Sequence, residues 1–180
     1  MHRAGLLKLI QQYKKKYPLE TSVADTMVAF IESHEDCFER TQLSGHITGS
    51  AWVVNQTGTH VLLTHHRKLN RWLQLGGHAD GQSEIIEVAK REGMEESGID
   101  DLCIDSPEIF DLDIHAIPAN GKEPEHLHYD VRFVLRTAGN EKFVISEESH
   151  SLAWVPIDDL CRYTKEASML RMRDKWIERS

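Results

Sequence analysis

One segment constrains this chain more than any other. Residues 77–99 read Gly-His-Ala-Asp-Gly-Gln-Ser-Glu-Ile-Ile-Glu-Val-Ala-Lys-Arg-Glu-Gly-Met-Glu-Glu-Ser-Gly-Ile. The spacing of apolar residues predicts a helix over 83–97, and Gly98 is placed to end it. On that helix Glu92, Glu95 and Glu96 stand at i, i+3 and i+4, so their carboxylates share about 100° of arc.

Three like charges on one helix face lower its stability by roughly a few tenths of a kcal/mol per pair. A hard divalent cation removes this repulsion, because Mg²⁺ prefers carboxylate oxygens and keeps waters that a phosphate can displace. Arg91 flanks the same face and can hold one carboxylate in a fixed rotamer. A solvated acidic face is the commoner meaning of such a run, but the glycines at both ends favour a defined loop–helix–loop unit.

The segment resembles the signature of the Nudix hydrolase family, G-x5-E-x7-R-E-U-x-E-E-x-G-U, in which U is a bulky aliphatic residue. The positions that match at the required spacing are Gly77, Arg91, Glu92, Glu95, Glu96, Gly98 and Ile99. Two positions depart from the signature, since Ser83 replaces its first glutamate and Gly93 replaces a bulky aliphatic residue. Glu84, one position later, falls near Arg91 and Glu95 on a continuous helix, so we expect it to replace the missing carboxylate.

The resemblance implies a Nudix-like α/β/α sandwich with a mixed sheet, and metal-dependent hydrolysis of a diphosphate linkage in a nucleoside-diphosphate derivative or similar small molecule. It implies that Mg²⁺ or Mn²⁺ binds to Glu92, Glu95 and Glu96 and that Arg91 completes the catalytic centre. Many Nudix enzymes place a glutamate that acts as a base in the loop before a strand that corresponds to 153–156. Glu147 and Glu148 occupy that position here, and Glu148 is the catalytic candidate, although a surface loop is the simpler interpretation of either residue.

The rest of the chain divides into an N-terminal helical segment, 1–40, and a Nudix-like domain, 41–180. Strands are expected at 47–55, 60–64, 72–75, 104–117 (interrupted by Pro107), 126–136 and 153–156, and a closing helix at 165–179. Gly76 and Gly77 are expected to break the third strand, and residues 56–58 to turn the first strand into a hairpin with the second. Because strands and helices mix without regular alternation, an α/β sandwich is favoured over a doubly wound sheet.

Several further residues are candidates for substrate binding. His126, His128, Asp130 and Arg132 alternate with apolar residues, so on a strand they share one face that would border a pocket. The spacing of the two histidines suggested a cupin metal pair, but the glutamate that a cupin needs is missing. We retain His128 and Arg132 as candidates, together with Gly77, His78 beside it and Arg67 as a phosphate contact; solvent-exposed or spectator roles explain them equally well.

Composition limits the other possibilities. The formal charge of −8 argues against a nucleic-acid polymer as partner, and no apolar run is long enough to span a membrane. Three widely spaced cysteines favour neither a disulfide framework nor a zinc ribbon, so a cytoplasmic location is expected. Two other functions stay open: a catalytically silent ligand-binding module, suggested by Ser83, and an isomerase of a diphosphate lipid. The oligomeric state is open too, a homodimer being common among Nudix proteins.

Overall fold

The computed structural model describes residues 2–67, 69–119, 121, 124–145 and 149–179. Helices α1 (Ala4–Lys16) and α2 (Thr21–Ser33) come first, joined by a short 3-10 turn, η1 (Pro18–Glu20). The strands are β1 (Gly45–Val54), β2 (His60–His66), β3 (Arg71–Leu73), β4 (Leu75–His78), β5 (Leu102–Ile104), β6 (Asp111–Ile117), β7 (His126–Thr137) and β8 (Ser149–Pro156). Helix α3 (Ile85–Ser97) follows β4, and η2 (Ile157–Arg162) and α4 (Ala167–Arg179) end the chain.

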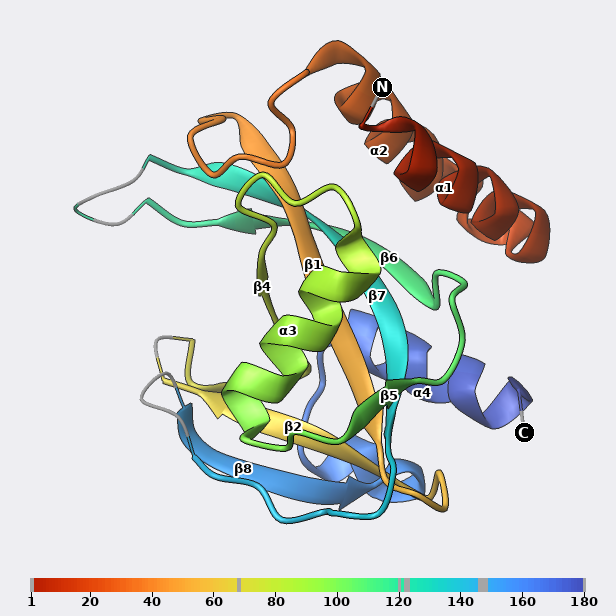
Figure 1. The fold of residues 1–180 in the computed structure, drawn as a ribbon, viewed down its shortest axis with the longest axis vertical. Helices are drawn as coiled ribbons and strands as arrows, with labels where there is room; N and C mark the ends of the chain where they lie inside the picture. The colour runs from red at the N-terminus through yellow and green to blue at the C-terminus, as the bar shows by residue number, and fades with distance from the viewer. Residues whose placement is uncertain (1, 68, 120, 122–123, 146–148, 180) are drawn as a thin grey trace.

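The described strands form one mixed sheet of eight, with the central order β3-β2-β1-β7-β5. β1 and β7 run parallel along their whole common length, from Gly45 opposite Leu127 to Val54 opposite Arg136. The remaining pairs are antiparallel, including the expected hairpin of β1 with β2. The predicted mixed sheet is therefore confirmed, and β1 lies at its centre, between β7 and the two strands β2 and β4 (Figure 1).

Helices cover both faces of this sheet, so the layers are α/β/α as predicted. α3 lies across the face turned to the viewer in Figure 1, and α4 lies behind it. Alternate residues of β1 point to the two sides: Ala51 and Val53 belong to the apolar core beneath α3, whereas Trp52 and Val54 pack with Met172 of α4. This alternation follows from the two-residue period of a strand.

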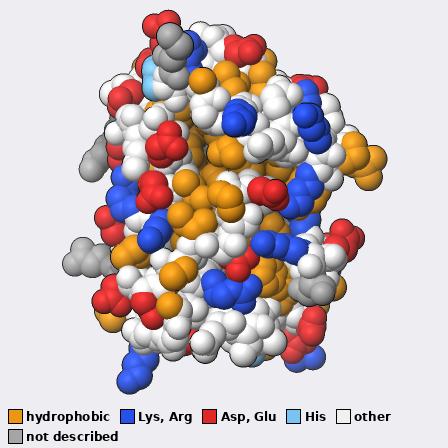
Figure 2. Space-filling model, turned by 45° about the vertical axis from the view of Figure 1, so that its right-hand side comes forward, with side chains coloured by type: hydrophobic (Ala, Val, Ile, Leu, Met, Phe, Trp, Pro, Cys, Tyr) orange, Lys and Arg blue, Asp and Glu red, His pale blue; other side chains and the backbone are white. Residues whose placement is uncertain are grey.

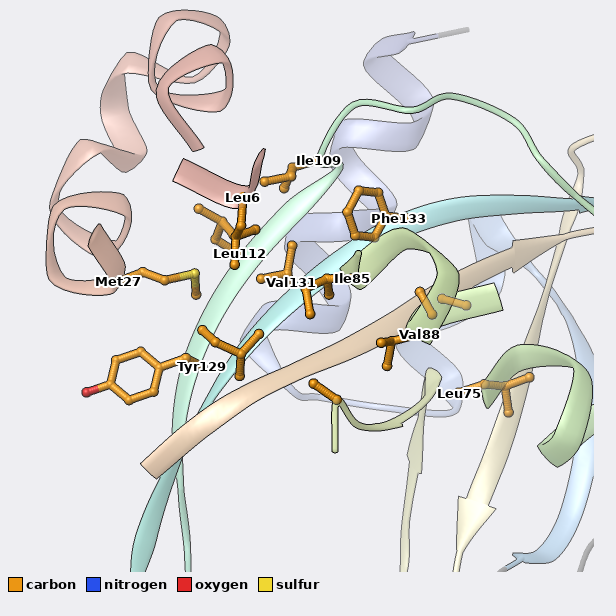
Figure 3. Packing of buried hydrophobic residues seen from close by; sticks show 14 of the residues in the cluster. Leu6, Met27, Leu75, Ile85, Val88, Ile109, Leu112, Tyr129, Val131 and Phe133 are labelled. Carbon is orange, nitrogen blue, oxygen red and sulfur yellow. The ribbon is translucent and has the colours of Figure 1, made fainter. Parts of the chain in front are cut away.

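The N-terminal helices share the core of the sheet on the α3 side. Leu6 of α1 and Met27 of α2 lie beside Leu112 and Val131 in one packed cluster (Figure 3). The ring of Phe30 on α2 stacks on Tyr129 of β7, with centroids 3.9 Å apart. Residues 1–40 were expected to be helical, and their apolar stripe is buried against strands that begin only at Gly45.

Three predicted elements differ from the structure. Gly76 and Gly77 do not end a strand but lie within β4, opposite Ser50 and Gly49 of β1. A Cβ at position 76 would lie 2.7 Å from the Ser50 Cα, so only glycine lets the two backbones approach this closely. The stretch 104–117 is interrupted around Pro107 as expected, but its first strand, β5, ends at Ile104 and its second, β6, begins only at Asp111. Helix α3 begins at Ile85 rather than at residue 83.

The surface shows no concentrated charge on the face drawn in Figure 2, where acidic and basic side chains surround a central band of apolar atoms. Within the described part of the chain, no helix combines the length and the apolar character that crossing a membrane requires.

Candidate functional site

Helix α3 is held against the sheet by small residues at the contact. A Cβ at Gly49 of β1 would lie 2.9 Å from Val88, so the helix approaches the strand more closely than a larger residue would permit. Gly93 is buried, and its open side is filled by Leu135 and Leu102, whose Cδ1 atoms would stand 3.2 and 3.3 Å from an added Cβ. These two leucines explain why glycine replaces the bulky aliphatic residue of the signature.

Gly98 ends α3 as its position in the sequence predicts. Its backbone is left-handed, with φ 67°, and its N–H bonds to the Met94 carbonyl. A residue with a Cβ pays a conformational penalty in this region, and glycine does not. After this turn the chain continues to β5, and Glu95 near the end of α3 is exposed.

Arg91 organises the acidic face of α3. Its guanidinium donates to the Glu92 carboxylate at 2.8 Å, to the His78 carbonyl at 2.8 Å and to the Gln82 side-chain oxygen at 3.2 Å. One cation thus ties α3 to the end of β4 and to the loop between them. Gln82 was not among the site residues predicted from the sequence. Its position next to Ser83, where the signature has a glutamate, was the only feature that could have pointed to it.

Glu92 is confined from a second side by Gly77 on β4. A Cβ at position 77 would lie only 2.5 Å from the Glu92 carboxylate carbon, so the carboxylate occupies the space that any other residue would fill. Its side chain is 17% exposed, and the Arg91 bond holds one of its oxygens. Glycine at position 77 is therefore a requirement of the acidic site itself.

The remaining signature carboxylates lie on the same helix, Glu96 half-buried and Glu95 exposed. Within the described chain, the three glutamates do not converge on one point as closely as a group of three histidines does. Their chemistry nevertheless fits a hard divalent cation, because all are carboxylates that water can reach and one is held in place by Arg91 and Gly77. Glu92, Glu95 and Glu96 are the residues that would hold it.

Glu84 lies beside α1 at the start of α3. It precedes the first turn of α3 with a non-helical backbone, φ −85° and ψ 83°, and its carboxylate faces α1, where a Cβ at Gly5 would lie 3.8 Å from it. Together with Ser83 it lines a cavity of about 260 Å³ between α1 and the start of α3. Because α3 begins at Ile85, Glu84 precedes the helix instead of lying in its first turn.

Arg132 lies in a buried ion-pair network on the face of the sheet opposite to the one that α3 covers. Its side chain is 2% exposed, and its nitrogens donate to Asp130 at 2.6 Å, Asp111 at 3.0 Å and Asp113 at 3.2 Å. Thr48 and Ser50 of β1 donate to Asp130 from the other side. The predicted common face of β7 is thus present, but at Arg132 it faces carboxylates in the protein interior.

The same network extends to the C-terminal helix. Arg171 bonds to Asp111 at 2.8 Å and to Asp113 at 3.1 Å, and Lys175 bonds to Asp111 at 2.7 Å and to Glu20 at 2.9 Å. Burial by itself would raise the pKa of the Asp113 carboxyl, but hydrogen bonding from His115 and the charge of Arg132 outweigh it and hold that pKa below its usual range. These contacts lock α4 and η1 to the sheet.

His78 and His128, both candidates from the sequence, lie together. Their ring centroids are 5.1 Å apart, and the ring of His46 stands 5.0 Å from His78 and 4.9 Å from His128. Burial and the neighbouring imidazoles of His78 and His46 lower the pKa of His128 to about 2, so its ring is neutral at physiological pH. His46 was not among the site residues predicted from the sequence.

The other candidates are placed separately. Arg67 is exposed, and its guanidinium donates to the Ser149 carbonyl at 3.2 Å, next to the start of β8. Glu147 and Glu148 lie outside the described residues.

The comparisons with known proteins agree with the signature. The NUDIX domain family matches residues 46–177. Among solved structures, a NUDIX-family hydrolase from Clostridium perfringens is 24% identical, with a TM-score of 0.57 over 75% of this chain and 98% of that one. The Escherichia coli dihydroneopterin triphosphate pyrophosphohydrolase is 16% identical (TM-score 0.57; 74% and 96% covered), and a Caenorhabditis elegans Ap4A hydrolase complex is 18% identical (0.52; 73% and 95%). Among curated proteins, none matches the chain.

Because the family match covers most of the chain, the chain belongs to the NUDIX domain family. The predicted family and fold are confirmed. Residues 1–45 lie outside the match, although α1 and α2 pack into the core of the matched region.

Proposed function

We propose that this chain is a Mg²⁺- or Mn²⁺-dependent hydrolase of a diphosphate linkage in a nucleoside-diphosphate derivative or a similar small molecule. The observation that carries the proposal is the position of Glu92, confined by Gly77 and bound by Arg91 at one end of the matched family's acidic helix. The names of two structural neighbours, an Ap4A hydrolase and a dihydroneopterin triphosphate pyrophosphohydrolase, support a small molecule that contains linked phosphates.

Each side chain on α3 has a distinct part in this proposal. Arg91 fixes the orientation of Glu92 and joins it to the β4 backbone, so that carboxylate needs no reorganisation when substrate binds. Glu95 and Glu96 complete the set of oxygen ligands from the next turn. A divalent cation held there supplies charge that neutralises phosphate oxygens and lowers the pKa of a water molecule. The proton acceptor is drawn from Glu95, Glu96, Glu147 and Glu148.

The proposed substrate contacts come from both faces of the sheet. Gly77 lies against Glu92 on the α3 side, and the His78 side chain lies on the other side of the sheet. Arg67 is exposed just after β2, where a guanidinium can bind a phosphate. His128 borders His78 across the sheet. Arg132 acts indirectly, because its three bonds to carboxylates hold β6 and β7 together beneath that surface.

The test is phosphate release with Mg²⁺ or Mn²⁺ from a panel of nucleoside triphosphates, dinucleotide polyphosphates, nucleotide sugars, ADP-ribose, NADH and coenzyme A. Mass spectrometry of products formed in ¹⁸O-labelled water then identifies the phosphorus that water attacks. Glu95→Gln and Glu96→Gln should each greatly reduce turnover without unfolding the chain. Glu87→Gln is the matched control, since Glu87 is an exposed glutamate in the first turn of α3.

Two results would contradict the proposal. Wild-type rates in both the Glu95 and the Glu96 variant would exclude the acidic face as the catalytic site. A panel in which no compound is hydrolysed, yet one raises the melting temperature, would establish the silent binding module instead.

A further inference from the structure

Three histidines that are distant in the sequence meet on one side of the sheet. His46 of β1 lies directly opposite His128 of the parallel strand β7, and His78 of β4 lies opposite Thr48, two residues along β1 from His46. Residues paired across strands share a face, as do residues two apart. β1 lies between β4 and β7 (Figure 1), so three hydrogen-bonded strands carry the three rings.

This face is not the one that carries the acidic helix. Gly49 of β1 packs against Val88 of α3, and its neighbours Thr48 and Ser50 point the other way, towards Asp130. His46 is two residues from Thr48 on the same strand, so its side chain lies on the same face as that of Thr48. The histidines and the α3 glutamates are therefore separated by the thickness of the sheet, and the histidine group is a site of its own.

The three rings already have the spacing that one metal ion imposes. Their centroids form a nearly equilateral triangle with sides of 4.9, 5.0 and 5.1 Å, and one nitrogen of each ring lies within 4.8 Å of the others. A zinc ion binds imidazole nitrogen at about 2.0–2.1 Å, which puts the centroids of two rings in a tetrahedral site about 5 Å apart. Small side-chain rotations would bring the nitrogens to the ion.

Burial also suits a metal ligand set. His46 is 3% exposed, and the Nε2 atom of His128 is buried with no hydrogen-bond partner among the described residues. A buried polar nitrogen without a partner is costly, and coordination to an ion removes that cost.

We propose that His46, His78 and His128 bind one transition-metal ion of the zinc type. Imidazole nitrogen is a borderline ligand that selects Zn²⁺, Co²⁺, Ni²⁺ or Cu²⁺ over Mg²⁺, whereas the carboxylates of α3 have the opposite preference. Three protein ligands leave a fourth position open, as in zinc sites that bind water or a small ligand. The strand backbones hold the ligands rigidly in place.

The experiment uses the full chain without a polyhistidine tag, stripped of metal and titrated with Co²⁺. We expect one equivalent of Co²⁺ to bind with the visible absorption of a low-coordinate site, Zn²⁺ to displace it and excess Mg²⁺ to leave it unchanged. Zn²⁺ should raise the melting temperature of the wild type. His78→Asn should weaken Co²⁺ binding by at least about 100-fold, because even groups that only support a ligand contribute about 10–100-fold.

His78 is the main variant because its side chain is only half-buried, and circular dichroism confirms that the variant is folded. His150→Asn, at an exposed histidine of β8, is the matched control and should bind Co²⁺ like the wild type. Glu95→Gln should also bind normally, which separates this site from the proposed hydrolytic one. Absence of stoichiometric Co²⁺ binding to the wild type, or equal affinity in folded His78→Asn, would overturn the proposal.

Discussion

Gly77→Ala tests the acidic site at a position where an added Cβ would collide with the Glu92 carboxylate. The new Cβ would lie 2.5 Å from the Glu92 carboxylate carbon, whereas ordinary contacts are about 3.5–4.0 Å, so the carboxylate must move by about 1 Å. The obstructing group is the end of a flexible side chain, so the backbone need not shift. We therefore expect the fold to survive and the alignment of Glu92 with Arg91 to be lost.

The two effects can be estimated separately. Breaking the partly exposed Arg91–Glu92 pair costs about 1 kcal/mol or less, which in a chain of this size lowers the melting temperature by about 2–4 °C. A displacement of about 1 Å at a catalytic group can reduce turnover by about 100-fold. Gly77→Ala should thus be nearly as stable as the wild type and about 100-fold slower.

Gly76→Ala is the matched comparison, one residue away. Its Cβ would meet the Ser50 Cα of β1 at 2.7 Å, so a strand backbone must move, at a cost of about 3 kcal/mol and about 6–12 °C in melting temperature. Gly139→Ala, where nothing lies within 4 Å, controls for the substitution itself. Thermal unfolding by circular dichroism and metal-dependent phosphate release measure both quantities. A folded Gly77→Ala variant within about threefold of the wild-type rate would refute the argument.

Three further predictions concern the charged groups. Arg91→Lys should reduce turnover by about tenfold or more with little loss of stability, because an ammonium cannot bridge Glu92 and Gln82 as the planar guanidinium does; equal rates would contradict this. Lys175→Met should destabilise the chain by about 3–5 kcal/mol in urea unfolding, since it leaves the buried Asp111 without one of its cations; a loss below about 1 kcal/mol would exclude that role. Because the pKa of Asp113 is lower in the folded chain than the unfolded value of about 3.9, its ionised carboxylate stabilises the fold above that pH, and the stabilisation is lost as the pH falls below it. The melting temperature should therefore decline more steeply below about pH 4 in the wild type than in Asp113→Asn. Parallel declines in the two proteins would contradict this role of Asp113.

Local patterns in the sequence predicted the acidic helix well. The i, i+3, i+4 spacing of its glutamates, the flanking Arg91 and the terminating Gly98 depend only on helical geometry, which neighbouring residues determine. The start of the helix was harder to predict, because Glu84 has no local signal that distinguishes a cap from a first turn. Because the helix begins two residues later than expected, Glu84 lies against α1, and Gln82 is one of three groups that accept hydrogen bonds from Arg91.

The strands were predicted as elements, but their pairing was not. Gly76 and Gly77 are ambiguous in the sequence, since glycine can end a strand or permit two backbones to approach closely. Only the contact with Ser50 and Glu92 shows that the second meaning applies. Likewise, the alternation in β7 correctly indicated two faces, yet it could not reveal that Arg132 meets Asp111 and Asp113 from another strand.

The sequence by itself determined the family, the acidic helix and the order of helices and strands, because these depend on spacing within a few residues. The tertiary structure decided which distant groups meet. His46, His78 and His128 come from three strands separated by dozens of residues, and only the register of β1 with β4 and β7 brings their rings to about 5 Å. Register depends on packing across the whole sheet, and no local pattern in the chain encodes it.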